Sequence, residues 1–136
     1  MDPLKSVIAV SASGMRAQAA RLRVVSENIA NASSAPNTPG EDPYRRKLVT
    51  FGSHVDEATG ASVVEVASID KDLSDFVVRY EPSHPAADEN GFVRYPNVNP
   101  LLEMSNMREA SRSYEANMTM FENAREMRRQ LIDLLK

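Results

Sequence analysis

The sequence predicts a mainly α-helical chain with a small β insertion, and two observations lead to this prediction. Seven of the eight prolines and four of the five glycines in the 136 residues fall between positions 33 and 100, so both ends are free to form long helices. Apolar residues recur at spacings of seven near both ends, which is typical of helices that pack along one face. We therefore expect the terminal helices to pack as an antiparallel, coiled-coil-like pair, with a β-rich middle segment.

The first helix is expected to begin at Asp2-Pro3 and to end near Asn31-Ala32. Asp2 suits the N-cap, and Pro3 suits the first helical turn. At 1.5 Å per residue the helix would be roughly 40–45 Å long. The predicted assembly and packing residues on it are Ile8, Met15, Leu22, Val25, Asn28, Ile29 and Asn31.

The middle of the chain has the composition of loops and short strands. Residues 33–43 form a predicted linker, and residues 44–100 form a predicted small, β-rich outer domain. Its four expected strands are 46–51, 62–67, 76–80 and 92–95. Residues 1–32 and 101–136 together make up the predicted helical core domain, which is discontinuous in sequence.

The second helix is expected over residues 101–136, which contain no proline or glycine. Apolar residues again recur at a spacing of seven. The predicted packing residues on this helix are Met104, Met107, Tyr114, Asn117, Phe121 and Leu131.

Asparagine is a poor helix former, so the asparagines on the helices need a cause. Asn31 is interpreted as a C-cap. Asn117 lies inside the second stripe, where its amide either fixes the register against another helix or faces solvent. The pattern alone leaves both alternatives open.

The chain offers little for catalysis, metals or nucleic acids. It has no cysteine, and its two histidines, His54 and His84, fall in turn-like segments without suitable partners. Asp70, Asp72 and Asp75 lack the rest of a calcium loop, so they are interpreted as solvated turn acids. No enzyme activity and no cofactor are predicted, and no strongly basic segment indicates a nucleic acid as partner.

Two further features bear on partners. The short basic cluster 45–47 either meets an acidic neighbour or is a solvated strand start. The longest strongly apolar run near the start, residues 7–10, is too short for a membrane span or a cleavable signal peptide.

Many apolar residues lie off the two stripes, and an isolated helix pair would leave them in water. They are Val7, Val10, Val24, Leu101, Met118, Met120, Met127 and Leu134. This surplus predicts self-assembly with other copies of the chain.

The N-terminal region resembles the signature of the flagellar axial proteins, which include rod and hook components. The matching stretches are Ser13-Gly14-Met15-x-Ala17-Gln18 and Arg21-Leu22-x-Val24-Val25-Ser26-Glu27-Asn28-Ile29-Ala30-Asn31. Pro43-Tyr44-Arg45-Arg46-Lys47, residues 91–99 and residues 103–117 are similar to the short proximal rod proteins of the flagellar basal body. The length also resembles these proteins rather than the longer distal rod and hook proteins.

The resemblance implies a structural, non-enzymatic subunit of the basal-body rod, which crosses the periplasm. It implies that the terminal helices form an inner layer around the export channel and that the middle segment faces outward. The implied partners are other rod proteins, proximal and distal, the adapter at the rod base and the flagellar type III export apparatus, with export that needs no cleaved signal. Two alternatives stay open: a sister proximal rod protein of similar length, and an export chaperone or adaptor that binds a partner helix.

Overall fold

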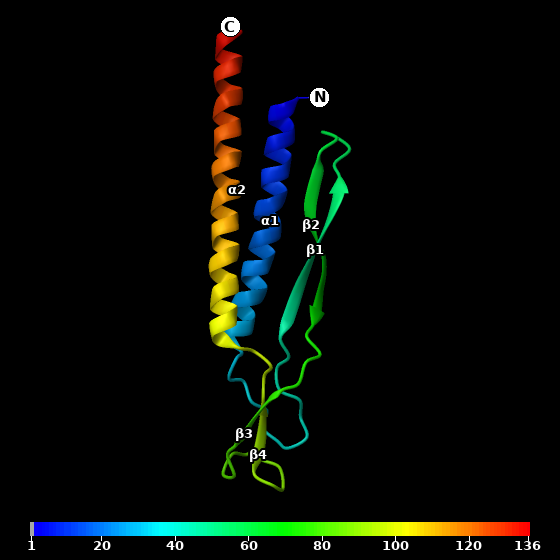
Figure 1. Ribbon diagram of the computed structural model, residues 1–136, viewed down its shortest axis with the longest axis vertical. Coiled ribbons are helices and arrows are strands. Elements are labelled where there is room, and N and C mark those ends of the chain that lie inside the picture. Colours follow the sequence, from blue (N-terminus) through cyan, green and yellow to red (C-terminus); the bar gives the residue numbers. More distant parts are fainter. Residues whose placement is uncertain (1) are drawn as a thin grey trace. The chain divides into compact units, whose positions relative to one another are not determined.

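The structure, a computed structural model that describes residues 2–136, has a long helix near each end of the chain and four strands between them (Figure 1). The helices are α1, Pro3–Ala30, and α2, Pro100–Leu134. The strands are β1 (Lys47–Val55), β2 (Ser62–Lys71), β3 (Val77–Tyr80) and β4 (Phe92–Tyr95). The predicted class, mainly helical with a small β insertion, is confirmed, and β1 and β2 are longer than predicted.

Both helices begin with the same local arrangement, an acidic or amide residue followed by proline. Asp2 Oδ1 accepts a hydrogen bond from the Leu4 amide at 3.0 Å. Asn99 Oδ1 accepts one from the Leu101 amide at 3.1 Å. Each side chain thus satisfies an N–H group that has no partner inside its helix, and the proline that follows has no N–H to satisfy.

The strands form two separate two-stranded sheets, β1 with β2 and β3 with β4. A tight turn joins β1 to β2, with the Asp56 amide 2.8 Å from the Ala61 oxygen. β3 and β4 are antiparallel, with Val77 opposite Tyr95 and Tyr80 opposite Phe92. The second hairpin has a small core of its own on one side, made of Ala86, Val93 and Tyr95.

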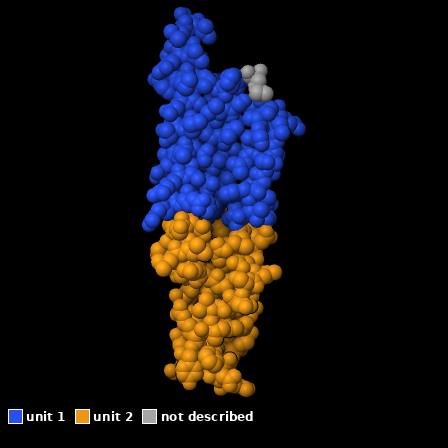
Figure 2. All heavy atoms as spheres, in the orientation of Figure 1, with its two compact units in different colours: residues 1–22, 49–68, 108–136 blue, residues 23–48, 69–107 orange. Residues whose placement is uncertain are grey.

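The chain divides into two compact units, and both helices and the β1–β2 hairpin contribute to each (Figure 2). Unit 1 consists of Met1–Leu22, Val49–Ser68 and Arg108–Lys136, and unit 2 of Arg23–Leu48 and Ile69–Met107. A compact unit within one chain need not coincide with an inner or outer layer of an assembly, so these two units do not test the predicted layers. The predicted separation into a helical core domain and an outer β domain therefore stays a prediction.

The deepest part of α1 in unit 1 carries small residues rather than the large residues of the predicted stripe. Ser11, Ser13 and Ala17 are buried, whereas Met15 and Leu22 are half-buried. The helix is contacted from two directions, by α2 and by the hairpin, so the arc between these neighbours is the best covered. Close approach of backbones from two sides favours small side chains there.

One apolar residue expected to lie off the stripe in water, Val24, is instead only 3% exposed. No helix within residues 2–136 is both long enough and apolar enough to cross a membrane.

Candidate assembly site

In unit 1, α1 and α2 approach each other closely where Gly14 meets Asn117. A Cβ atom on Gly14 would lie only 2.6 Å from Asn117 Oδ1. The Asn117 amide nitrogen donates to the Ser113 carbonyl of its own helix at 2.8 Å. The Asn117 amide therefore packs against Gly14 and bonds to its own helix, so among residues 2–136 it does not form the hydrogen bond to another helix that one alternative expected. Seven residues along α1, Arg21 forms an ion pair with Glu109 at 3.4 Å.

Two apolar grooves lie along this pair of helix segments. The first, here called the Tyr114 groove, has a volume of about 270 Å³ and is lined by Ala12, Met15, Arg16, Ala19, Tyr114 and Phe121. The second, here called the Met120 groove, has a volume of about 240 Å³ and is lined by Ser6, Val7, Val10, Ser11, Asn117 and Met120. Both grooves leave apolar side chains of both helices accessible to another protein surface.

The last turns of α2 have no cover within the described chain. Ala124 is buried, but every residue from Arg125 onward is exposed. Exposed apolar residues lie along this stretch, including Met127 (54%) and Leu134 (80%). A helical segment as short as the end of α2 from Arg125 onward is only marginally stable in water when nothing packs against it, so a packing partner would stabilise it.

The hairpin is attached to α1 in unit 1 by a serine that the sequence reading did not single out. Ser13 Oγ accepts a hydrogen bond from the Val64 amide of β2 at 3.2 Å and donates to the Val10 carbonyl of α1 at 2.7 Å. The two residues are far apart in sequence, so no local pattern could indicate this contact.

In unit 2, the buried side chain of Asn28 serves as a partner for the strand that begins at Lys47. Its Nδ2 donates to the Lys47 carbonyl and its Oδ1 accepts from the Lys47 amide, both at 2.9 Å. The Tyr44 hydroxyl also donates to Oδ1, at 2.6 Å. Asn28 is completely buried, so these bonds satisfy polar groups that water cannot reach.

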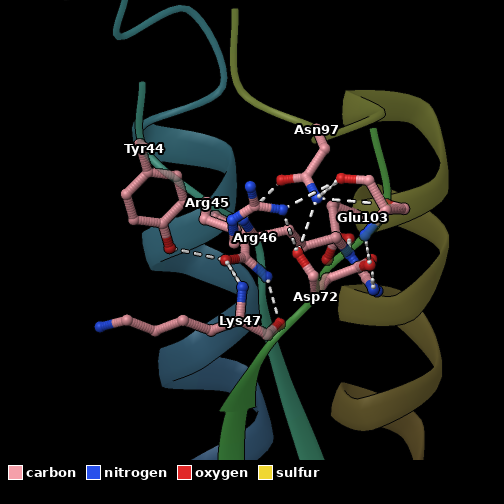
Figure 3. Close-up of polar contacts among 9 residues, drawn as sticks. Tyr44, Arg45, Arg46, Lys47, Asp72, Asn97 and Glu103 are labelled. Carbon is pink, nitrogen blue, oxygen red and sulfur yellow. Dashed lines mark hydrogen bonds and ion pairs between the residues drawn. The ribbon is translucent and has the colours of Figure 1, made fainter. Parts of the chain in front are cut away.

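Arg46 lies at the centre of an ionic cluster in the same unit (Figure 3). Its Nε donates to Glu103 Oε1, and its Nη1 lies 3.2 Å from Asp72 Oδ2. The Glu103 side chain is 1% exposed, and within residues 2–136 its Oε2 has no hydrogen-bond partner. Asn97 Oδ1 accepts from the Arg46 backbone amide at 2.8 Å.

The cluster settles one open alternative and corrects one interpretation. The basic residues 45–47 do meet acidic neighbours, since Lys47 also pairs with Glu27 at 2.6 Å. Asp72 is not a solvated turn acid: its side chain is 22% exposed and pairs with Arg46. Hydrogen bonds from Ser74 and the nearby Arg46 guanidinium hold the pKa of Asp72 below its ordinary value.

Tyr44 lies near the same charged groups, and they change the pKa of its hydroxyl. Burial, followed by the negative charges of Glu27 and Glu103, raises the pKa of its hydroxyl to about 12. The neutral hydroxyl, which donates to Asn28, is therefore the form that the folded unit favours.

The remaining predicted packing residues differ in burial. Val25 is buried, Ile8, Ile29 and Met107 are half-buried, and Met104 and Leu131 are about half exposed. Asn31 directly follows the last residue of α1, and its Nδ2 donates to the Glu27 carbonyl at 2.9 Å, while its backbone is not in the left-handed conformation of the usual C-cap.

The histidines are not grouped into a reactive site. His54 lies in β1 rather than in the expected turn, 3.2 Å from Glu65 Oε2, while His84 Nδ1 accepts from the Ala86 amide at 3.0 Å. Across residues 2–136, no three His, Cys, Asp or Glu side chains are placed to hold a metal ion.

Two protein families match the two ends of the chain. Residues 8–40 match the family described as flagella basal body rod protein, and residues 89–134 match the family described as flagellar basal body rod FlgEFG protein C-terminal. Over its full length the chain is 53% identical to the flagellar basal-body rod protein FlgC of Agrobacterium fabrum, of which the match covers 98%.

More distant relatives carry the same name. The FlgC protein of Salmonella typhimurium is 40% identical, over 91% of this chain and 92% of its own length. That of Borreliella burgdorferi is 38% identical, over 98% of both chains. The chain therefore belongs to the family of the flagellar basal-body rod protein FlgC.

Proposed function

We propose that this chain is a structural subunit of the bacterial flagellar basal-body rod and that it self-assembles through the outer faces of its terminal helices. The observation that carries the proposal is the row of exposed apolar side chains on α2, in a chain similar to rod proteins over its whole length. Apolar surface left uncovered on a single copy favours association.

The helices are proposed to act as an antiparallel, coiled-coil-like pair. Two contacts support this arrangement: Gly14 lies against Asn117, and Arg21 pairs with Glu109. Residue numbers thus rise along one helix as they fall along the other. Apolar grooves along such a pair allow further copies to pack against it.

The finer assignments follow from the resemblance and are proposals. The subunit would lie in the proximal rod, where the rod crosses the periplasm, and would contact its own copies, other rod proteins, proximal and distal, and the adapter at the rod base. It would reach that place through the flagellar type III export apparatus without a cleaved signal. No catalytic step, cofactor or nucleic acid has a part in this function.

Leu22→Asp tests the proposal. Leu22 is half-buried on α1, and a carboxylate buried there without a partner would cost several kcal/mol per subunit by order of magnitude. The same change at Leu73, which is 83% exposed in unit 2, is the matched control. In a strain without its own copy of the gene, the parent and L73D should restore basal bodies with rods, and L22D should not, at equal protein levels.

Two results would contradict the proposal. If the parent gene fails to restore rods, the chain does not have this function in that host. If L22D builds rods as frequently as the parent, the helix face that carries Leu22 does not take part in assembly.

A further inference from the structure

We propose that an extended segment of a different protein adds to the free edge of β3, in unit 2, as a third strand of the sheet, and that this segment carries an acidic residue between two apolar ones. The inference goes beyond the proposed function, which uses the terminal helices. It depends on three features of unit 2: the register of the β3–β4 sheet, the exposure of β3 and the charge of Arg79.

The backbone groups of β3 that point away from β4 are unpaired within the described chain. The Glu81 amide donates at 2.9 Å to the Gly91 oxygen, and this pair continues the β3–β4 register. Hydrogen-bonded and non-bonded pairs alternate along an antiparallel sheet, so Val78 and Tyr80 direct their N–H and C=O groups to the outer edge. Among residues 2–136, no segment bonds to β3 on that side. Such an edge can accept a further strand.

The outer edge of β4, by contrast, is already covered at Phe92. The Phe92 amide donates to Asp88 Oδ1, and the Phe92 carbonyl accepts from the Asp88 amide, both at 2.9 Å. Covering an edge with a loop is one way in which proteins prevent the addition of strands. The sheet is therefore open to growth on the β3 side, where a third strand would stabilise a sheet that is marginal with two.

Exposed apolar side chains lie beside the free edge. Val78, Tyr80 and Phe92 share one face of the sheet, because Tyr80 lies opposite Phe92 and every second residue of a strand points the same way. The Tyr80 side chain is 66% exposed, yet its ring is held in place. The ring lies 5.4 Å from that of Phe92, and a Cβ atom on Gly91 would come within 2.8 Å of it. A fixed, exposed aromatic ring suits an anchor for a partner.

The charge at the centre of the edge is positive. Arg79 is exposed on the other face of β3, and within the described chain it forms no ion pair. Its guanidinium lies 4.5 Å from the centre of the Tyr95 ring, while the Glu81 carboxylate is bonded to the Tyr95 hydroxyl at 2.5 Å. An added strand places one residue directly opposite Arg79, and opposite charges in such a pair are favourable. The partner segment is therefore acidic at that position.

The same charge argues against a second copy of β3 as the occupant. When two copies pair antiparallel about the centre of the strand, Arg79 faces Arg79, and like charges directly opposite are destabilising. A shift of the register in one direction brings Glu81 opposite Asp75, which also carry like charges. A shift in the other direction brings Glu81 opposite Arg79 but sets Pro82, which has no N–H group, into a hydrogen-bonded position. A segment of different sequence has none of these conflicts.

Titration of the whole, isotope-labelled chain with capped synthetic peptides tests the inference by NMR. The probe is Val-Thr-Val-Glu-Val-Thr-Val, and a matched probe has lysine in place of glutamate. Two further probes carry one N-methyl group each. In one it replaces the N–H of the valine after the glutamate, which would bond to β3; in the other it replaces the N–H of the glutamate, which would point away. The protein variants are Arg79→Glu and, as a matched control, Arg23→Glu, an exposed arginine of α1 in the same unit.

We expect the amide signals of Val78, Arg79 and Tyr80 to shift with the glutamate probe. This probe should bind the parent about fivefold more tightly than the lysine probe, and the order should reverse in R79E but not in R23E. The N-methyl group on valine should weaken binding about tenfold or more, and that on glutamate less than about threefold, because only the first removes a hydrogen bond to β3.

Three results would overturn the inference: no shift at β3, equal binding of the two charged probes by the parent, or equal effects of the two N-methyl groups. Self-association of the chain that the glutamate probe disrupts at β3 would overturn it as well, since a second copy would then be the occupant. The assembly of rods through the terminal helices does not depend on any of these outcomes.

Discussion

In unit 2 the buried polar groups are held in a network, with Asn28 bound to both backbone groups of Lys47 and Arg46 bound to Glu103. In unit 1 the two helices meet through Gly14 and Asn117, and the ion pair of Arg21 with Glu109 lies in the open, where Glu109 is 68% exposed. Both units leave apolar side chains of α2 exposed, such as Met104 in unit 2 and Met127 in unit 1, so the units differ in how their buried polar groups are bound.

The difference shows how one small chain combines a unique structure with a capacity to assemble. A buried polar network tolerates few alternative arrangements, because any loss of register leaves a donor or acceptor without a partner. Association of apolar faces is non-directional, so it is less specific for one arrangement than a polar network is. We infer that the polar network fixes the structure of unit 2 and that the uncovered last turns of α2, in unit 1, gain stability from neighbouring copies.

The largest effect is expected from Glu103→Ala in unit 2. It leaves the Arg46 guanidinium without its most buried partner, and breaking such a pair typically costs about 3–5 kcal/mol. Glu109→Ala removes the exposed carboxylate of unit 1 and should cost at most about 1 kcal/mol. Urea unfolding measures both, and equal losses would contradict the contrast between the units.

A smaller loss is expected from Asn28→Ala. The Lys47 amide, the Lys47 carbonyl and the Tyr44 hydroxyl lose their partner together, at a cost of about 2–3 kcal/mol. Asn31→Ala, which removes only a helix-end contact, is the control and should cost less than about 1 kcal/mol. Hydrogen exchange should speed up at the Lys47 amide in N28A alone; unchanged exchange there would count against the role of Asn28.

Gly14→Ala tests the contact that aligns the helices of unit 1. In an open helix this change would stabilise by up to about 1 kcal/mol, but here the new methyl group overlaps Asn117 and should destabilise by about 1–2 kcal/mol. Asn117→Ala removes the obstacle, so the double variant should recover most of the loss. Additive effects of the two changes in thermal unfolding would show that the residues do not interact.

The smallest effect concerns alkaline pH and unit 2. The pKa of Tyr44 is about 12 in the folded protein against its ordinary value of 10.0, so the stabilisation is complete below pH 10 and is lost as the pH rises toward 12. The Tyr44→Phe variant has no hydroxyl to ionise at this position. Between pH 9 and 11 its free energy of unfolding, measured with urea, should fall less than that of the parent, by roughly a few tenths of a kcal/mol or more. Identical slopes in parent and variant would contradict this assignment.

Local patterns were sufficient for the secondary structure. The caps at Asp2 and Asn99, the lack of proline inside the helices and the clustering of turn residues between strands depend only on neighbours in sequence. The heptad spacing likewise placed Met15, Tyr114 and Phe121 beside one groove. The contacts of Ser13, Gly14 and Glu103 were not predicted, although all three lie in stretches that resemble flagellar proteins, because each has its partner far along the chain.

By itself, the sequence determined two long helices, four strands in order and a surplus of apolar side chains that calls for other copies, because periodicity and turn composition act within a few residues. Only the tertiary structure decided that Asn28 completes the start of β1, that Arg46 is bound by a glutamate from the first turn of α2, and that small residues are the buried ones on α1 within unit 1. These outcomes depend on which distant segments meet and how closely. Burial and hydrogen-bond satisfaction are properties of that meeting, so no local pattern contains them.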